Sequence, residues 1–221
     1  MRKLRILCLH GYHGSAKTLQ MQMRPITQGL EPLAEFVCVD APSLANGDFG
    51  WWHAVPSDGG DAKHAGLGRS AMRYQGWPKT KDWLVSLFRQ SPPFDGVFGF
   101  SQGAALTSLL VGLRNQREAN AGISFDFAIM VGGFASNDGS HADLYQRKTQ
   151  YGLPSVHIFG TSDVVVPNSH SDHLAGFFKH PLILQHSGGH VVPDDPQVRR
   201  SVATFLQERA RDAAAHAARG A

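Results

Sequence analysis

Cysteine is scarce in this sequence, and the two that occur do not form a pattern typical of disulfides. Cys8 and Cys38 each lie inside a short apolar run of the 221-residue chain. Cysteines in such surroundings are usually buried, reduced and inert, as in proteins of the cytosol. We therefore expect free thiols and a cytoplasmic location.

Blocks of like charge and long apolar runs are also missing. The formal net charge of +3 comes from scattered Lys and Arg residues, so nothing indicates nucleic-acid binding. The first apolar run, LRILCL at residues 4–9, is far shorter than the roughly 20 residues of a membrane-spanning helix. No Pro/Ser-rich linker divides the chain, so we expect no membrane span and one domain over residues 1–221.

Short apolar runs alternate with amphipathic segments along the chain. The runs are rich in branched and aromatic residues and nearly continuous, as in strands that are covered on both faces. They lie at residues 4–9, 35–40, 96–100, 127–132, 155–160 and 182–186, with helical patterns at about 17–30, 79–90, 102–118, 168–178 and 194–216. This alternation predicts an α/β fold with a mostly parallel sheet of about six strands and helices on both faces.

One connection is much longer than the others. Between Ala41 and Pro78 the chain is rich in glycine, lacks a clear period and contains the adjacent pair Trp51 and Trp52. A loop of this length is usually a functional lid or a disordered insertion, and aromatic residues are uncommon in disorder. We predict a lid or insertion at residues 43–76 whose tryptophans contact the substrate. The alternative is that both rings pack as core at the sheet edge.

A pentapeptide with a central serine marks the candidate catalytic centre. The residues 99–103, GFSQG, have the form G-x-S-x-G between a predicted strand and a predicted helix. A sharp strand-to-helix turn strains the serine and presents its hydroxyl at the carboxyl end of the strand, where open α/β sheets bind ligands. The helix N-terminus behind it offers free N–H groups to an oxyanion. Ser101 is therefore the candidate nucleophile.

A serine becomes nucleophilic only when a base takes its proton and a third group orients that base. Asp163 and His190 each follow a predicted strand after a short turn, and the order Ser, Asp, His is expected for this architecture. His157 and His186 lie within predicted strands, where structural roles prevail. Solvation and capping account for the remaining candidates on helix surfaces or first turns, which are His170, His173, His180, Asp172, Asp194 and Asp195.

The negative oxygen of a tetrahedral intermediate needs two hydrogen-bond donors. We predict the backbone N–H of Gln102, directly after the serine, and that of Tyr12, in the glycine-containing loop after the first strand. His10 and His13 lie in the same loop, but no third residue with suitable spacing accompanies them. We therefore expect neither a metal nor a cofactor.

Several segments together resemble the fungal-type FSH1 serine hydrolase family, which is related to the human ovarian-tumour candidate hydrolase. They are LHGYHGSAKTLQ, the WW pair, Tyr74-x-Gly76, GFSQGAAL, PSVHIFGTSDVVVP and SGGHVVP, and the resemblance extends from about residue 3 to residue 207. It implies a compact α/β-hydrolase with Ser101, Asp163 and His190 as its triad. It also implies esterase or thioesterase activity on acyl chains, including release of acyl groups from carrier-bound thioesters in some relatives.

The sequence thus predicts a serine hydrolase that cleaves carboxylic esters or thioesters through an acyl-enzyme, with a small acyl ester or thioester as its partner. One alternative is a ligand-binding receptor on the same fold that hydrolyses slowly or not at all, and another is an inactive structural protein. Chain length, leaving group and the choice between monomer and homodimer stay open, because one fold serves many chemistries.

Overall fold

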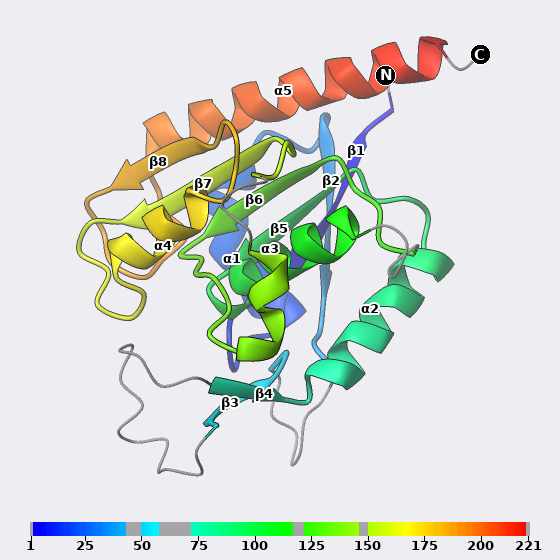
Figure 1. Ribbon diagram of the computed structural model, residues 1–221. Coiled ribbons are helices and arrows are strands. Elements are labelled where there is room, and N and C mark those ends of the chain that lie inside the picture. The colour runs from blue at the N-terminus through cyan, green and yellow to red at the C-terminus, as the bar shows by residue number, and fades with distance from the viewer. Residues whose placement is uncertain (1, 43–49, 58–71, 117–121, 146–149, 220–221) are drawn as a thin grey trace.

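Six strands form one parallel sheet in the order β2-β1-β5-β6-β7-β8 (Figure 1). The computed structural model describes residues 2–42, 50–57, 72–116, 122–145 and 150–219. The strands are β1 (Leu4–Leu9), β2 (Ala34–Val39), β5 (Gly96–Phe100), β6 (Phe127–Val131), β7 (Ser155–Gly160) and β8 (Leu182–His186). The predicted six-stranded parallel sheet is confirmed.

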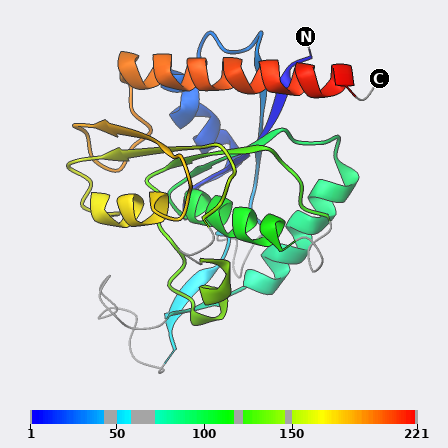
Figure 2. The same cartoon turned by 45° about the horizontal axis from the view of Figure 1, so that its top comes forward.

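Helices cover both faces of the sheet, as predicted. Figure 2 shows α1 and α5 on one face and α2, α3 and α4 on the other. Their bounds are α1 (Ala16–Thr27), α2 (Trp77–Gln90), α3 (Gln102–Asn115), α4 (Asn168–Ala175) and α5 (Pro196–Arg219). Strand side chains alternate between the two cores: in β1, Leu4 and Ile6 face α1 and α5, whereas Leu7 and Leu9 face the other layer.

The strand order reverses at β1. The chain runs from β1 outward to β2 and then returns to β5 on the opposite side of β1. In open α/β sheets ligands bind where the strand order reverses, outside the carboxyl ends of the strands. Leu9 lies opposite Gly99, so the segments that follow β1 and β5 leave the sheet side by side.

The long connection contains regular structure that the sequence did not predict. β3 (His53–Pro56) and β4 (Met72–Gln75) pair there as an antiparallel two-stranded sheet. A further unpredicted element, a 3-10 helix at Gly139–Leu144, lies between β6 and β7. Strands of four residues are too short to show an alternating pattern. Residues 43–49 and 58–71 of the predicted lid lie outside the described residues.

Two features of the fold bear on the expectations about thiols and membranes. Cys8 and Cys38 are both free thiols on neighbouring strands, with Cys8 buried and Cys38 half-buried. Among the helices that the structure describes, none combines the length and apolar character required to cross a bilayer.

Candidate active site

Ser101 stands at a sharp turn between β5 and α3. Its φ of 55° and ψ of −118° lie in a region that non-glycine residues rarely adopt. Gly99 and Gly103 allow the turn, because a Cβ at Gly99 would collide with the carbonyl of Gly103 and one at Gly103 with the carbonyl of Leu9. The strained serine and the steric need for both glycines match the prediction from the motif.

The structure brings Ser101, His190 and Asp163 into one hydrogen-bonded chain. The Nδ1 atom of His190 lies 2.6 Å from Oδ2 of Asp163, and its Nε2 lies 2.8 Å from Oγ of Ser101. A carboxylate only accepts hydrogen bonds, so Nδ1 carries the proton of the neutral ring. Nε2 is then the acceptor for the Ser101 hydroxyl, which is the arrangement that a general base requires.

Asp163 is fixed through both of its carboxylate oxygens. Oδ2 accepts from His190, and Oδ1 accepts from the backbone N–H groups of Val165 at 2.9 Å and Val166 at 2.8 Å. Its side chain is only 1% exposed. Backbone donors and exclusion of water thus hold the carboxylate in the orientation in which it meets the imidazole.

The turns that carry the acid and the base are joined to each other. The N–H of Thr161 donates to the carbonyl of His186 at 2.8 Å, and that of Ser162 donates to the carbonyl of Gly188 at 3.2 Å. The N–H of Gly188 also donates to Nδ1 of His186 at 3.2 Å. These bonds extend the pairing of β7 with β8 past the strand ends and fix the distance between Asp163 and His190.

Gly132 and Phe100 contact the imidazole, although the sequence did not single them out. Gly132 has a φ of 58°, and a Cβ there would lie 2.9 Å from Cε1 and 3.1 Å from Nδ1 of His190. The Phe100 ring centroid lies 5.0 Å from that of His190. The glycine pair that ends the apolar run FAIMVGG was the available signal for a close approach.

The loop after β1 packs directly against Ser101. A Cβ at Gly11 would lie 3.3 Å from Cβ of Ser101, and the N–H of Gly14 closes a tight turn on the carbonyl of Gly11 at 3.0 Å. Gln102 is the first residue of α3, so its N–H has no acceptor within the helix. The N–H groups predicted for the oxyanion thus belong to two segments that meet beside the nucleophile.

Trp51 joins these two segments. Its indole N–H donates to the carbonyl of His10 at 2.8 Å, and its backbone N–H donates to Oε1 of Gln102 at 3.0 Å. Nε2 of Gln102 in turn donates to the carbonyl of Trp52 at 2.9 Å. The position of the loop after β1 relative to the start of α3 is therefore fixed by Trp51 and Gln102.

Neither tryptophan presents a surface to a substrate in this structure. Trp51 is 0% and Trp52 1% exposed, and Trp52 stacks on Tyr74 with ring centroids 4.5 Å apart. This packing fits the core alternative, because a ring that contacts an open acyl pocket would be accessible to water. Direct contact of Trp51 and Trp52 with the substrate has no support from the described residues.

With this geometry established, comparison with known proteins identifies the family. The FSH1 family of serine hydrolases matches residues 1–202. The chain belongs to this family.

Curated relatives of this FSH1 member carry esterase names. Esterase OVCA2 of Xenopus tropicalis is 33% identical over 209 residues, which cover 87% of this chain and 87% of that protein. Esterase OVCA2 of Homo sapiens is 30% identical, covering 94% of this chain and 97% of that protein. Esterase CG5412 of Drosophila melanogaster is 30% identical and covers 97% of this chain and 77% of that protein.

Solved structures of more distant proteins share the fold. Acyl-protein thioesterase 2 of Zea mays matches with a TM-score of 0.66 at 19% identity, covering 95% of each chain. The Bacillus cereus carboxylesterase matches with a TM-score of 0.59 at 15% identity, covering 94% of this chain and 89% of that one. The architecture of this FSH1 member is that of an α/β-hydrolase.

Other histidines of this FSH1 member have structural contacts. Both ring nitrogens of His10 face backbone groups: Nδ1 donates to the carbonyl of Gly11 at 2.7 Å, and Nε2 accepts from the N–H of Ala41 at 3.0 Å. Burial lowers the pKa of His10 from its ordinary value. His157 is buried in β7 beside the Ser155 hydroxyl, and burial lowers its pKa to about 3. The contacts of His157 agree with the structural role predicted for it, and those of His10 are with backbone groups.

Exposed apolar side chains flank the site residues along the chain. Val164, 90% exposed, and Val165 follow Asp163, and Val191 follows His190. Tyr12 is also exposed, and its hydroxyl hydrogen-bonds to Nδ1 of His53 at 2.8 Å. The segments that carry the acid, the base and the predicted oxyanion donor thus each present an apolar group to solvent.

Proposed function

We propose that this FSH1 member hydrolyses carboxylic esters or thioesters, with Ser101 as nucleophile, His190 as general base and Asp163 as the group that orients the base. The observation that carries the proposal is the unbroken chain of hydrogen bonds from Ser101 through His190 to Asp163. The esterase names of relatives at 30% identity or more support an acyl ester as substrate.

In the first half-reaction, Oγ of Ser101 attacks the carbonyl carbon while its proton passes to Nε2 of His190. The proton on Nδ1 stays in the hydrogen bond to Asp163, whose negative charge stabilises the imidazolium. The bond from the carbonyl carbon to the alcohol oxygen or thiol sulfur then breaks. Nε2 returns the proton to that leaving group, and the acyl group remains on Ser101.

In the second half-reaction, water takes the place of the leaving group. Nε2 of His190 removes a proton from the water, which attacks the acyl carbon, and the Ser101 oxygen leaves with the proton from Nε2. The products are a carboxylic acid and the regenerated serine. The two half-reactions consume one ester and one water molecule and need no further reactant.

The tetrahedral intermediates of both steps carry a negative oxygen. We assign the backbone N–H groups of Gln102 and Tyr12 as its donors, because Gln102 begins α3 and the loop of Tyr12 packs against Ser101. A donor of this kind lowers the barrier by about 3–4 kcal/mol in serine hydrolases. The exposed valines beside the acid and the base offer apolar contact to the acyl chain.

Ser101→Ala tests the nucleophile. We expect kcat toward p-nitrophenyl butyrate to fall by about a thousandfold or more, because no other group in this scheme can form the acyl-enzyme. Labelling by a fluorophosphonate probe should disappear in the same variant. Ser187→Ala, the same change at an exposed serine, is the matched control and should keep both activity and labelling.

Two results would contradict the proposal. Activity within about tenfold of wild type in folded Ser101→Ala protein would remove Ser101 as the nucleophile. A wild-type protein that binds ester substrates but neither hydrolyses them nor reacts with the probe would favour the receptor alternative.

His190→Ala should lower kcat nearly as much as Ser101→Ala does, since the Ser101 hydroxyl then has no base.

A further inference from the structure

A cavity lies at the opposite end of the sheet from Ser101. Its volume is about 630 Å³. Its walls are residues 152–154 and Ser155 at the start of β7, Lys179, His180 and Leu182 at the start of β8, and α5. Ser101, Asp163 and His190 follow the carboxyl ends of β5, β7 and β8, so the cavity and the candidate active site are separate. Its size is within the range of small-molecule sites.

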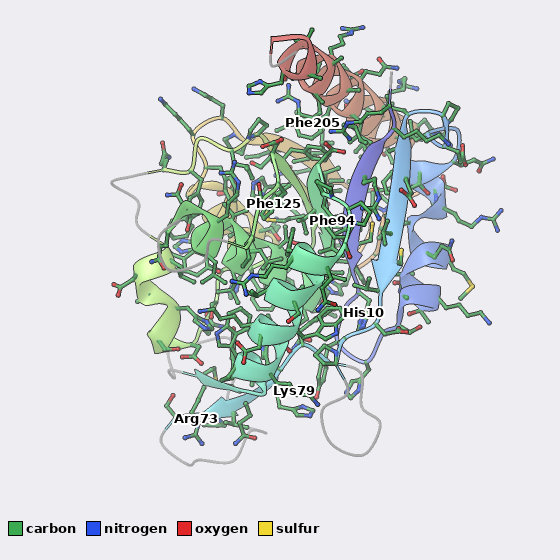
Figure 3. The ribbon with its side chains drawn as sticks, turned by 90° about the vertical axis from the view of Figure 1, so that its right-hand side faces the viewer. His10, Arg73, Lys79, Phe94, Phe125 and Phe205 are labelled. Carbon is green, nitrogen blue, oxygen red and sulfur yellow. The ribbon has the colours of Figure 1, made fainter. Side chains whose placement is uncertain are left out.

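One face of α5 forms a wall of this cavity. The helix contributes Arg200, Ser201, Thr204, Phe205, Glu208 and Arg209. These positions are separated by alternating steps of one and three residues, which places them on one side of a helix. Figure 3 shows Phe205 on the underside of α5, toward the sheet.

Positive side chains dominate the charged groups of the lining. Lys179, Arg200 and Arg209 carry positive charge, against the single carboxylate of Glu208 among the lining residues. Lys179 comes from the segment before β8 and the two arginines come from α5. Positively charged side chains thus line the cavity on two sides, which favours an anionic ligand.

Arg209 has a donor that the described part of the chain leaves unused. Its Nε is buried and has no hydrogen-bond partner there. Among the described residues, its Nη2 lies 3.4 Å from Glu208 and 3.3 Å from Asp212, and both carboxylates are largely exposed. Nε is shielded from solvent, whereas the Arg209 side chain as a whole is 19% exposed and lines the cavity. What Arg209 offers to a ligand there is the positive charge of its guanidinium.

Part of the remaining lining is apolar. Phe205 and Leu153 are buried side chains, and Leu182 of β8 is partly exposed. The guanidinium of Arg209 lies over the Phe205 ring, 5.2 Å from its centroid, which joins the charged part of the cavity to the apolar part.

We propose that this cavity binds a small amphiphilic anion. Arg209, Arg200 and Lys179 hold its carboxylate or phosphate, and its alkyl or aryl part covers Phe205 and Leu182. A free inorganic anion leaves the apolar wall uncovered, and an uncharged alcohol leaves the positive charges of Arg209, Arg200 and Lys179 without a counter-charge. The ligand therefore needs both an anionic group and an apolar group. A medium-chain fatty acid and an alkyl phosphate each have both.

Isothermal titration of the full chain carrying Ser101→Ala with octanoate and octyl phosphate tests the proposal and excludes turnover. We expect at least one of the two to bind, with the comparison of their dissociation constants deciding which headgroup is preferred. Octanol, acetate and inorganic phosphate should bind at least tenfold more weakly. Binding of octanol as tight as that of the anions, or of phosphate as tight as octyl phosphate, would overturn the assignment.

Variants locate the binding. Arg209→Gln should weaken binding at least tenfold, and Thr204→Trp, which fills the cavity from α5, should abolish it. Arg211→Gln and Gln207→Trp are matched controls on α5 outside the lining, and both should bind as the parent protein does. Arg200→Gln, at an exposed position, replaces Arg209→Gln if that variant fails to fold. Unchanged binding in Thr204→Trp and in the arginine variants would overturn the proposal.

Discussion

Gly132 packs against the imidazole of His190, the candidate base. Its left-handed backbone, with a φ of 58°, ends β6 and brings the main chain against the imidazole of His190. A methyl group there would lie 2.9 Å from Cε1, which is closer than carbon atoms approach without displacement. Alanine is also strained at this φ. The position of His190 relative to Ser101 therefore depends on the absence of a side chain at residue 132.

Gly132→Ala should lower kcat by about tenfold to a hundredfold, because a displacement of the base by a fraction of an ångström lengthens its hydrogen bond to Ser101. Ester hydrolysis and the melting temperature are measured together. Gly139→Ala is the control, since a Cβ at that position meets no atom within 4 Å. If Gly132→Ala folds and keeps wild-type kcat, His190 does not depend on this contact.

At the scale of elements, local pattern predicted the parts of the site that follow strands. The alternation of apolar runs predicted the sheet, and G-x-S-x-G between a strand and a helix predicted the turn at Ser101. Asp163 and His190 were predictable because parallel strands end at one edge. The partners of Trp51 could not be predicted in this way, because its hydrogen bonds reach His10, 41 residues away in sequence, and Gln102, 51 residues away.

The segment 50–57 therefore acts on the site through contacts that sequence periodicity does not show. It was expected to contact substrate as part of a lid, whereas Trp51 is buried between the loop after β1 and the start of α3. Trp51 is a positioning residue in this arrangement. Removing its indole N–H leaves the carbonyl of His10 without that donor, at a cost of about 1–3 kcal/mol.

Trp51→Phe keeps an aromatic ring but removes the indole N–H. We expect kcat to fall by about tenfold with KM nearly unchanged, because the loop of Tyr12 loses a restraint that matters most for the oxyanion. Trp83→Phe is the control: Trp83 packs against Trp51 at 6.1 Å between centroids and belongs to α2. A lower melting temperature with kcat intact in Trp51→Phe would mean that the residue serves stability alone.

At the scale of the whole molecule, buried histidines link stability to pH. Burial lowers the pKa of His10, His141, His157 and His186, and that of His157 to about 3. In the unfolded chain a histidine binds its proton near pH 6.5. Below that pH the unfolded state binds more protons than the folded state, so stability falls as pH falls.

Because of His157, the free energy of unfolding should fall by about 1.4 kcal/mol for each pH unit as the pH is lowered from roughly 6 to 4.5. Chemical denaturation of wild type and His157→Gln across this window measures the slope of unfolding free energy against pH. The variant is expected to be less stable at pH 7.5. Its unfolding free energy should also depend less steeply on pH, because unfolding then takes up about one proton fewer. Ser155→Ala is the control, because it removes the hydroxyl beside Nε2 and leaves the titrating ring in place.

Asp138 and Asp195, whose pKa values are lowered, lose their contributions to stability at more acidic pH, so they do not produce this slope. Equal slopes in wild type and His157→Gln would show that His157 is not the neutral buried base that its surroundings require.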